Sequence, residues 1–333
     1  MKKPHLHVFP ILAAIALCAV SGRSAADQPG QFESIFRLVR TNLVGLDVER
    51  YEREALRGLL RRMDGKVQLL KADEVIGVRG ELVNEAKVFE GKFGYVRVRA
   101  VEEGLADSLR EGLKGLIPSG DLRGLMVDLR FADGSDYEAA VRTVNEFVGR
   151  DETQLLVGER HLRTIQKSDL IRGPVAILVN SETGGAAEAL AALFRRNEVG
   201  LLIGSKTAGE TKVFSDFSLE NGNRLRVATG EVRSDDGLEL SSGGLQPDIL
   251  VPVDPGAERK FFGDAYAVPK GRKQPRGLVN EAALVRQLRQ RLNPDVAIPS
   301  APAKEEAPRE VFDPTLARAL DLLKGLNLLA PSK

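Results

Sequence analysis

The chain has 333 residues, and its 48 basic and 47 acidic side chains almost cancel, which does not favour binding to nucleic acid. Tryptophan is absent and aromatic residues make up 5% of the chain, which argues against an aromatic platform for sugars or bases. One cysteine and three histidines leave little material for a metal site, whereas 43% hydrophobic residues are sufficient for a globular core.

The N-terminus is typical of a secretory signal peptide. Lys2 and Lys3 precede an apolar run at residues 9–20, and Ser24-Ala25-Ala26 offers small residues for cleavage. The run is shorter than a membrane-spanning helix requires, and an N-terminal anchor helix is the alternative. We therefore predict a signal peptide over residues 1–26, a periplasmic or secreted mature protein, and no stable membrane span after cleavage.

Cleavage after residue 26 would change which reactive side chains the mature protein contains. It removes His5, His7 and Cys18 together with three basic residues, which leaves 45 basic and 47 acidic side chains. The only remaining histidine is His161, and no cysteine remains. This excludes a disulfide, a Cys-His pair and a metal site made of histidine or cysteine. A Ser-His-Asp triad could use only His161, in a predicted surface strand, so we expect no metal and no cofactor.

Residues 27–66 are predicted to form a helical segment. One helix should cover residues 31–43, where apolar residues recur at helical spacing. A second helix should begin after Asp47, a good N-cap, and end near Gly65. The sequence between Gly65 and Phe93 has room for one or two short strands.

Residues 67–255 are predicted to form the core, because apolar strands alternate with amphipathic helices. This alternation favours an α/β fold with parallel strand pairing. The first elements of this core are predicted to be a strand at residues 93–99, a helix at residues 101–117, a strand at residues 124–130, a helix that Asp136 caps and that ends near Gly149, and a strand pair within residues 154–166.

The centre of the core combines a strand at residues 175–179, a turn at Gly184 and Gly185, a helix at residues 186–196 and a strand at residues 199–203. Both strands are wholly apolar, as expected of strands that are covered on both faces. The glycine turn places the backbone N–H groups at the start of the helix around one point. That arrangement can hold an anion or a developing oxyanion.

The remaining sequence closes the core and adds a C-terminal extension. Strands are predicted at residues 212–219 and 224–228. Residues 256–310 should hold a helix, at about residues 280–292, and a linker rich in Pro, Ala and charged residues. Residues 311–333 should form a last helix that begins after Asp313 and either docks on the core or meets a partner.

Four short motifs lie in this core, and together they resemble one known family. They are Asp-Leu-Arg at residues 128–130, Ser-Glu-Thr-Gly-Gly-Ala-Ala-Glu at residues 181–188, Thr-Ala-Gly-Glu at residues 207–210 and Gly-Leu-Gln-Pro-Asp-Ile at residues 244–249. The set resembles the C-terminal-processing (tail-specific) serine peptidase family. The resemblance implies a crotonase/ClpP-like α/β core with an N-terminal helical prelude and a C-terminal helical appendage, in which Asp248 has a structural role.

The two residues that carry catalysis in that family have no equivalent here. The family's nucleophile is a serine three residues before a glutamate, and its base is the lysine of a Thr-Phe-Gly-Lys motif. Glu188 matches the glutamate, so Gly185 stands at the serine position, and Glu210 stands at the lysine position. Arg196 stands where some members have an aspartate. A nucleophilic mechanism requires both missing groups, so the resemblance implies the fold without the dyad.

Three interpretations of the altered site are open. Thr183, in the same turn, could replace the nucleophile, with Lys212 as its base. A buried Glu210 with a raised pKa could activate a water in the space left by the missing side chain. Alternatively, Glu210 could form a structural ion pair with Lys206, Lys212 or Arg196.

The resemblance also implies where a ligand would bind. In the family, the loop after Asp-Leu-Arg supplies a backbone N–H to the oxyanion hole. The candidate oxyanion or peptide-binding positions are therefore Gly134, Ser135, Gly184, Gly185 and Ala186. Many bacterial members carry a PDZ domain before the core, which needs on the order of 80 to 100 residues. Fewer than 30 residues separate Gly65 from Phe93, so we predict that this domain is absent.

The leading hypothesis is an exported, proteolytically inactive member of this family that still binds a peptide or protein partner in its cleft. One alternative is an active serine-type peptidase or hydrolase that uses Thr183 or a Glu210-activated water. The other is a structural subunit that pairs with an active paralogous peptidase.

Overall fold

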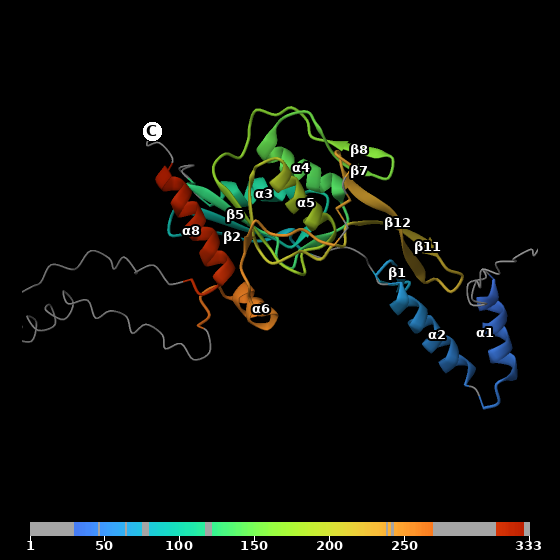
Figure 1. Ribbon diagram of the computed structural model, residues 1–333. Helices are drawn as coiled ribbons and strands as arrows, with labels where there is room; N and C mark the ends of the chain where they lie inside the picture. Colours follow the sequence, from blue (N-terminus) through green and yellow to red (C-terminus); the bar gives the residue numbers. More distant parts are fainter. Residues whose placement is uncertain are drawn as a thin grey trace, which may run out of the picture. The chain divides into compact units, whose positions relative to one another are not determined.

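The computed structural model describes residues 30–45, 47–63, 65–74, 80–116, 122–237, 239–240, 243–268 and 311–329 (Figure 1). The chain divides into two compact units, one that ends at Gly65 and one that begins at Lys66. The predicted signal peptide, the helix predicted at residues 280–292 and the linker lie outside the described residues.

The first unit contains two helices, as predicted. They are α1 (Gln31–Asn42) and α2 (Val48–Arg62). Asp47 caps α2, because its carboxylate accepts a hydrogen bond from the backbone N–H of Arg50 at 3.1 Å. The prediction of two helices with Asp47 as an N-cap is therefore confirmed. Every helix in the described part of the chain is too short or too polar to cross a membrane.

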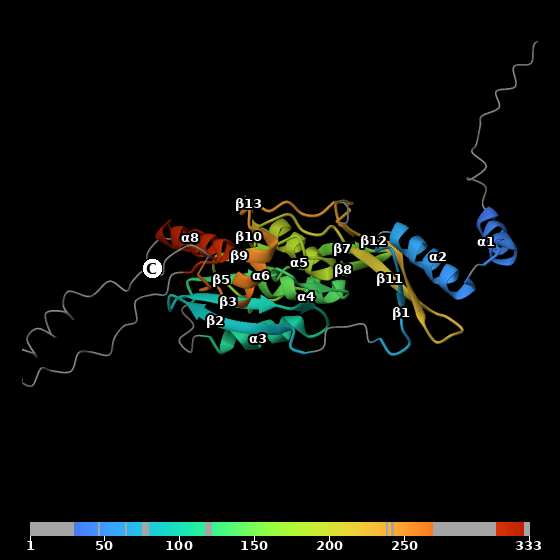
Figure 2. The same cartoon turned by 90° about the horizontal axis from the view of Figure 1, so that it is seen from below.

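The second unit is built on a six-stranded mixed sheet, whose strand order is β13-β10-β9-β5-β3-β2 (Figure 2). The strands are β2 (Val83–Phe89), β3 (Phe93–Val98), β5 (Gly124–Asp128), β9 (Val175–Val179), β10 (Gly200–Gly204) and β13 (Ile249–Leu250). All neighbours are parallel except β2 and β3. Parallel neighbours require crossover connections, which the helices provide, and this confirms the α/β prediction.

Helices cover both faces of this sheet. They are α3 (Leu105–Lys114), α4 (Tyr137–Val148), α5 (Gly185–Arg196) and α8 (Pro314–Leu329). The first three share a buried apolar cluster with one set of strand side chains, which includes Val96 and Val98. The last shares a second cluster with the alternate set, which includes Tyr95 and Met126. The last helix therefore docks on the core, which is one of the two arrangements predicted for it.

A buried ionic network fixes the start of α8 at the end of β5. Arg130 is 1% exposed, and its guanidinium donates to both carboxylate oxygens of Asp128 and to Oδ1 of Asp313 at 3.1 Å. The same Oδ1 accepts from the backbone N–H of Leu316 at 3.1 Å, so Asp313 also caps the helix, as predicted. The hydroxyl of Tyr95 donates to Asp128 at 2.7 Å, and burial raises the pKa of this hydroxyl.

A second, antiparallel sheet has the order β1-β12-β7-β8, and β11 also pairs with β12. Its strands are β1 (Val67–Leu70), β7 (Thr153–Val157), β8 (Arg160–Arg163), β11 (Lys212–Ser218) and β12 (Arg224–Ser234). A separate parallel pair joins β4 (Ala100–Val101) to β6 (Asp133–Gly134). Through this pair, β6 reaches the start of α5.

Three local predictions are corrected. The helix predicted from residue 101 begins at Leu105, because Ala100–Val101 form β4 and Gly104 turns the chain at a φ of 90°. β12 continues to Ser234, beyond the predicted residue 228, because β1, β11 and β7 pair with successive parts of it. The helix α6 (Pro255–Gly263) has no predicted counterpart, although Asp254 and proline at its first position signal a helix start.

Candidate functional site

The turn between β9 and α5 is fixed by Asn180 and Thr183. The side-chain oxygen of Asn180 accepts hydrogen bonds from the backbone N–H groups of Phe131 and Glu182, both at 3.1 Å. The hydroxyl of Thr183 accepts from the N–H of Asn180 at 3.0 Å and donates to the carbonyl of Leu129 at 2.9 Å. These bonds hold the end of β5 against the start of α5.

Position 185, where the resemblance places a nucleophile, can hold only glycine in this backbone. Gly185 is buried and has a φ of 52°, in the left-handed region that favours glycine. A Cβ added there would overlap the carbonyl oxygen of Gly134 and Oδ1 of Asp133. The position therefore has neither an attacking oxygen nor room for one.

The loop after β5 brings a carbonyl oxygen, not an N–H group, to this point. Gly134 belongs to β6 and has a φ of 149°. A Cβ on Gly134 would overlap the backbone of Val101, so its close pairing with β4 requires glycine. As a result, the carbonyl oxygen of Gly134 occupies the space next to Gly185.

Two of the predicted oxyanion donors are already used within the chain. The N–H and the hydroxyl of Ser135 both donate to Oε1 of Glu102, at 2.9 and 3.1 Å. The N–H of Gly184 donates to the carbonyl of Ala132 at 3.0 Å. The expectation that Ser135 and Gly184 offer free N–H groups to a ligand is therefore corrected. The other predicted positions, Gly134, Gly185 and Ala186, lie together around β6 and the first turn of α5.

Glu188 joins α5 to the loop at residues 207–210. Its side chain is fully buried and accepts hydrogen bonds from the hydroxyl of Thr207 and from the N–H groups of Gly209 and Glu210, both at 2.9 Å. Burial raises the pKa of the Glu188 carboxyl, and these hydrogen bonds oppose the shift. Glu188 therefore positions the loop that carries Glu210, a role that the sequence motif alone does not reveal.

The side chain of Glu210 does not have the surroundings that either interpretation of it requires. Glu210 is exposed, whereas the predicted general base requires a buried carboxylate. Within the described residues it forms no ion pair with Lys206, Lys212 or Arg196, and Arg196 is paired with Asp235 instead. The predictions of a buried base and of a structural ion pair are both corrected.

The substitute dyad is not assembled either. Thr183 is fully buried, and its proton is committed to the carbonyl of Leu129. Lys212 lies in β11, where its carbonyl oxygen accepts from the hydroxyl of Tyr137 at 2.9 Å. Burial raises the pKa of the Tyr137 hydroxyl, with a smaller effect of the charge of Asp133. The hydroxyl of Thr183 therefore stabilises the turn.

Two exposed carboxylates, those of Asp133 and Glu210, belong to residues that lie close to this turn. A Cβ added to Gly184 would lie 3.7 Å from Oδ1 of Asp133 and 3.9 Å from Cβ of Glu210. Asp133 is the residue that sequence reasoning missed, and its only signal was an acidic side chain beside Gly134. The start of a helix favours negative charge nearby, so this arrangement is electrostatically consistent. It can attract a cation or a basic side chain.

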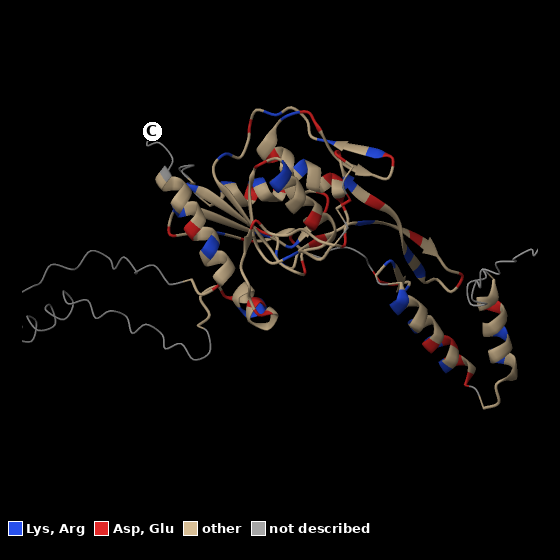
Figure 3. Ribbon diagram, viewed as in Figure 1, with Lys and Arg blue, Asp and Glu red and all other residues tan. Residues whose placement is uncertain are grey.

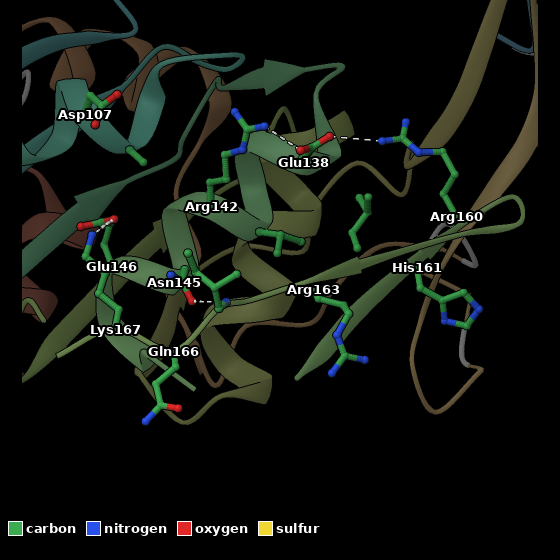
Figure 4. Close-up of a pocket in the computed structure, with 14 residues that line it drawn as sticks. Asp107, Glu138, Arg142, Asn145, Glu146, Arg160, His161, Arg163, Gln166 and Lys167 are labelled. Atoms are coloured by element: carbon green, nitrogen blue, oxygen red, sulfur yellow. Dashed lines mark hydrogen bonds and ion pairs between the residues drawn. The ribbon is translucent and has the colours of Figure 1, made fainter. Parts of the chain in front are cut away.

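A separate cavity of about 860 Å³ lies between α4 and the edge strand β8 (Figure 4). Glu138 accepts from Arg142 at 2.6 Å and from Arg160 at 3.1 Å, and these ion pairs lie along its rim. Asn145 accepts from the backbone N–H of Ile165 at 3.0 Å on its floor. The residues that line this cavity include none of the predicted site residues.

His161 is an exposed residue of β8, as predicted. Figure 4 shows its ring pointing away from Asn145. In the part of the chain that the structure describes, no group of three or more His, Cys, Asp or Glu side chains could hold a metal ion.

Comparison of the sequence with models of known families identifies one family that matches the central part of the chain. The sequence profile of peptidase family S41 matches residues 92–251, just under half of the chain. This part of the chain belongs to peptidase family S41. The matched region includes β3, β5, β9, α5 and the loop at residues 207–210, so it contains the turn and both carboxylates described above.

Relatives of this S41 domain are C-terminal processing peptidases. Carboxyl-terminal-processing peptidase 2, chloroplastic, of Arabidopsis thaliana is 25% identical over 178 residues, which are 52% of this chain and 34% of the relative. The carboxy-terminal-processing protease of Bartonella bacilliformis is 25% identical over 197 residues, 56% of this chain and 44% of the relative. The chain therefore spans less than half the length of these curated relatives.

Two solved structures match part of the chain. The photosystem II D1 C-terminal processing protease matches with a TM-score of 0.43 and 21% identity, over 56% of this chain and 47% of that chain. A lipoprotein from Streptococcus agalactiae matches with a TM-score of 0.49 and 20% identity, over 71% of this chain and 88% of that chain.

Proposed function

We propose that this S41 protein is proteolytically inactive and acts by binding a peptide or protein partner. The observation that carries the proposal is the closed position 185. There the carbonyl oxygen of Gly134 and the carboxylate of Asp133 fill the space that a nucleophile would need. Family S41 enzymes act on protein or peptide substrates, so a chain with this domain and no nucleophile retains a scaffold suited to such ligands.

The chemistry of the dyad explains why the loss is complete. A Ser-Lys dyad works because a buried, neutral lysine accepts the serine proton. Gly185 cannot form an acyl-enzyme, and Glu210 offers an exposed carboxylate in place of the amine. Loss of either partner alone removes most of a nucleophilic mechanism, and here both are absent.

We propose that the partner binds over the turn between β9 and α5, beside β6. Asp133 and Glu210 are both exposed there, and both lie close to Gly184. A ligand segment with a lysine or arginine would place its cationic group between them. Because both carboxylates are solvated, each contact is worth only about 0.2–1 kcal/mol, and most of the affinity must come from other contacts.

One assay tests the proposal of inactivity. The purified full chain is incubated with an unfolded protein substrate, alongside the Gly185→Ala and Glu210→Gln variants. We expect no cleavage by any of the three. Cleavage by the wild-type chain that either variant abolishes would contradict the proposal, because it would assign catalysis to this site. An active S41 peptidase in the same buffer is the positive control.

A second assay tests the proposed binding surface. Lysine-containing and lysine-free versions of one unfolded peptide are titrated against the wild-type chain and the Asp133→Asn/Glu210→Gln double variant. The lysine-containing peptide should bind the wild-type chain more tightly, and the double variant should lose that preference. Equal binding of both peptides by the wild-type chain would contradict this part of the proposal.

We further propose that the protein is exported and has no PDZ domain before its core. Export rests on the signal-like residues 1–26, and cell fractionation with N-terminal sequencing of the mature chain tests it. The absence of a PDZ domain rests on the short distance from Gly65 to Phe93, which includes the strands β1 and β2. C-terminal specificity of the family's kind is then not expected.

A further inference from the structure

The cavity between α4 and β8 contains a buried hydrogen-bond donor that the chain itself does not use. Asn145 of α4 lines this cavity and is 6% exposed, and its side-chain oxygen accepts from the backbone N–H of Ile165 at 3.0 Å. Its amide nitrogen can donate two hydrogen bonds, but it has no acceptor among the residues that the structure describes. A buried donor without a partner is costly, so an oxygen atom of a ligand would be favoured at this point.

The cavity borders the free edge of β8. This strand is the last in the order β1-β12-β7-β8, so only one of its edges is paired within the described part of the chain. All four residues of the strand, Arg160–Arg163, line the cavity, although successive side chains of a strand point to opposite faces. A hollow that touches both sets of side chains lies along the edge of the strand, where the backbone groups are.

The register of the β7–β8 hairpin indicates which backbone groups point outward. A two-residue loop joins the strands, and Val157 pairs with Arg160 beside it. In such a hairpin this pair exchanges backbone hydrogen bonds and the next pair, Leu156 with His161, does not. The N–H and the C=O of His161 therefore point away from β7, toward the free edge.

The charges around the cavity favour an acidic ligand. Both charged residues that β8 contributes are arginines, Arg160 and Arg163 (Figure 3). Arg160 and Arg142 share the one carboxylate of Glu138, and their side chains are still 70% and 58% exposed. Figure 4 shows both arginines reaching Glu138 from opposite sides. A guanidinium has five N–H donors, so each arginine keeps donors for the carboxylate of a ligand.

We propose that this cavity is a second binding site, in which an extended acidic segment of a partner protein adds as a strand to the outer edge of β8. The backbone of the segment bonds to the N–H and the C=O of His161, as in other cases of strand addition. Its carboxylates reach Arg142 and Arg160, and one of its oxygen atoms accepts from Asn145. The site requires a ligand of the opposite charge to the turn between β9 and α5, and it does not depend on the function proposed for that turn.

A labelled ten-residue peptide of alternating threonine and glutamate is the probe, and its neutral companion has glutamine in place of glutamate. Fluorescence anisotropy measures their binding to the purified full chain at low salt, where charge screening is weak. The acidic peptide should bind at least about ten-fold more tightly than the neutral one, because only its side chains complement the arginines. In hydrogen exchange, the bound peptide should slow the exchange of amides in β8.

Strand addition is tested at His161 by two variants. His161→Pro removes the outward N–H but no bond to β7, and an edge strand tolerates proline at such a position. It should weaken binding of the acidic peptide at least about ten-fold, because the first backbone bond is lost and the ring blocks the edge. His161→Ala keeps the N–H, so its affinity should stay within about two-fold of the wild type. Urea unfolding of both chains checks that each is folded.

The charge of the site is tested separately. Arg142→Gln/Arg160→Gln should lower the affinity for the acidic peptide to that for the neutral one. The matched control is Arg233→Gln, which removes an arginine of β12 that is 51% exposed, and it should bind both peptides as the wild type does. Asn145→Asp keeps the acceptor for the N–H of Ile165 but loses the donor, so it should also weaken the binding of the acidic peptide.

Four outcomes would overturn the proposal. The first is no binding of the acidic peptide at concentrations up to about 1 mM, and the second is equal binding of both peptides by the wild-type chain. Equal affinities of His161→Pro and His161→Ala would exclude strand addition to β8. Loss of acidic-peptide binding in the Asp133→Asn/Glu210→Gln chain would place the peptide at the turn between β9 and α5 instead.

Discussion

Gly185 stands where the resemblance places a nucleophile, and its surroundings predict that a serine cannot be introduced there without a large cost in stability. Gly185→Ser combines a left-handed φ with a clash against Gly134 and Asp133, so it should lower the free energy of unfolding by about 2–5 kcal/mol. Urea unfolding of the full chain measures this. The double change Gly185→Ser/Glu210→Lys should gain no peptidase activity.

A matched variant separates backbone strain from the clash. Gly158 also has a positive φ, 61°, but nothing lies within 4 Å of a Cβ added there. Gly158→Ser should therefore cost only the strain, about 1–2 kcal/mol. Equal costs at the two positions would show that position 185 has room for a side chain and would contradict the closed site.

The buried Glu188 predicts a pH dependence of stability. Its raised pKa means that the folded chain binds a proton more tightly than the unfolded chain. Stability from this group therefore falls as the pH rises from about 4.5 through the raised pKa. Glu188→Gln should remove that slope and still cost about 1–3 kcal/mol, because an amide cannot accept from all three donors.

Urea unfolding of the wild-type chain and of Glu188→Gln between pH 4 and pH 8 checks both statements. The difference between the two curves isolates Glu188 from the other carboxylates. A difference that stays constant with pH would show that Glu188 does not have a raised pKa in the folded chain.

The sequence located the residues of the site but not their environment. The spacing of the motifs was enough to identify Gly185, Glu188 and Glu210 as the residues at the site, because that spacing is a property of the sequence alone. Asp133 does not, because its place beside Gly185 depends on the pairing of β6 with β4, which brings residues far apart in the chain together. The exposure of the Glu210 side chain likewise depends on how the whole loop at residues 207–210 folds, and not only on the residues next to it in the sequence.

At the scale of elements, the docking of α8 depends on an ionic contact that mutation can isolate. Asp313→Ala leaves the buried Arg130 with one partner fewer and removes the cap of α8. The loss should be about 2–4 kcal/mol, because part of the buried guanidinium is left without an acceptor and the helix loses its N-cap. Urea unfolding compares it with Asp321→Ala, an exposed residue of the same helix, which should change stability by less than about 0.5 kcal/mol. Similar costs for the two would rule out the ionic anchor.

Elements with strong local signals were predictable, whereas those that depend on pairing were not. The strand β9 is a wholly apolar run and β5 is apolar up to Asp128, while Asp47, Asp136 and Asp313 mark helix starts, so each was predicted close to its bounds. The two-residue strand β4 has no pattern long enough to show period-two alternation. It exists only because β6 pairs with it, and the predicted helix there was therefore too long.

At the scale of the whole molecule, the two units should differ in how fast their backbone amides exchange with solvent. The second unit has its own buried clusters, so amide exchange in β5, β9 and α5 should be slow. The helices α1 and α2 have no buried residue, so their amides should exchange faster. Sequence shows that each of these helices is amphipathic, but no single chain can reveal which surface covers it.

Hydrogen exchange with mass spectrometry of the purified full chain measures this directly. Peptides from α1 and α2 should exchange faster than peptides from β5, β9 and α5. Equal protection of the two groups would show that another surface covers the two helices. Because the core peptides are measured in the same samples, they provide the internal standard for this comparison.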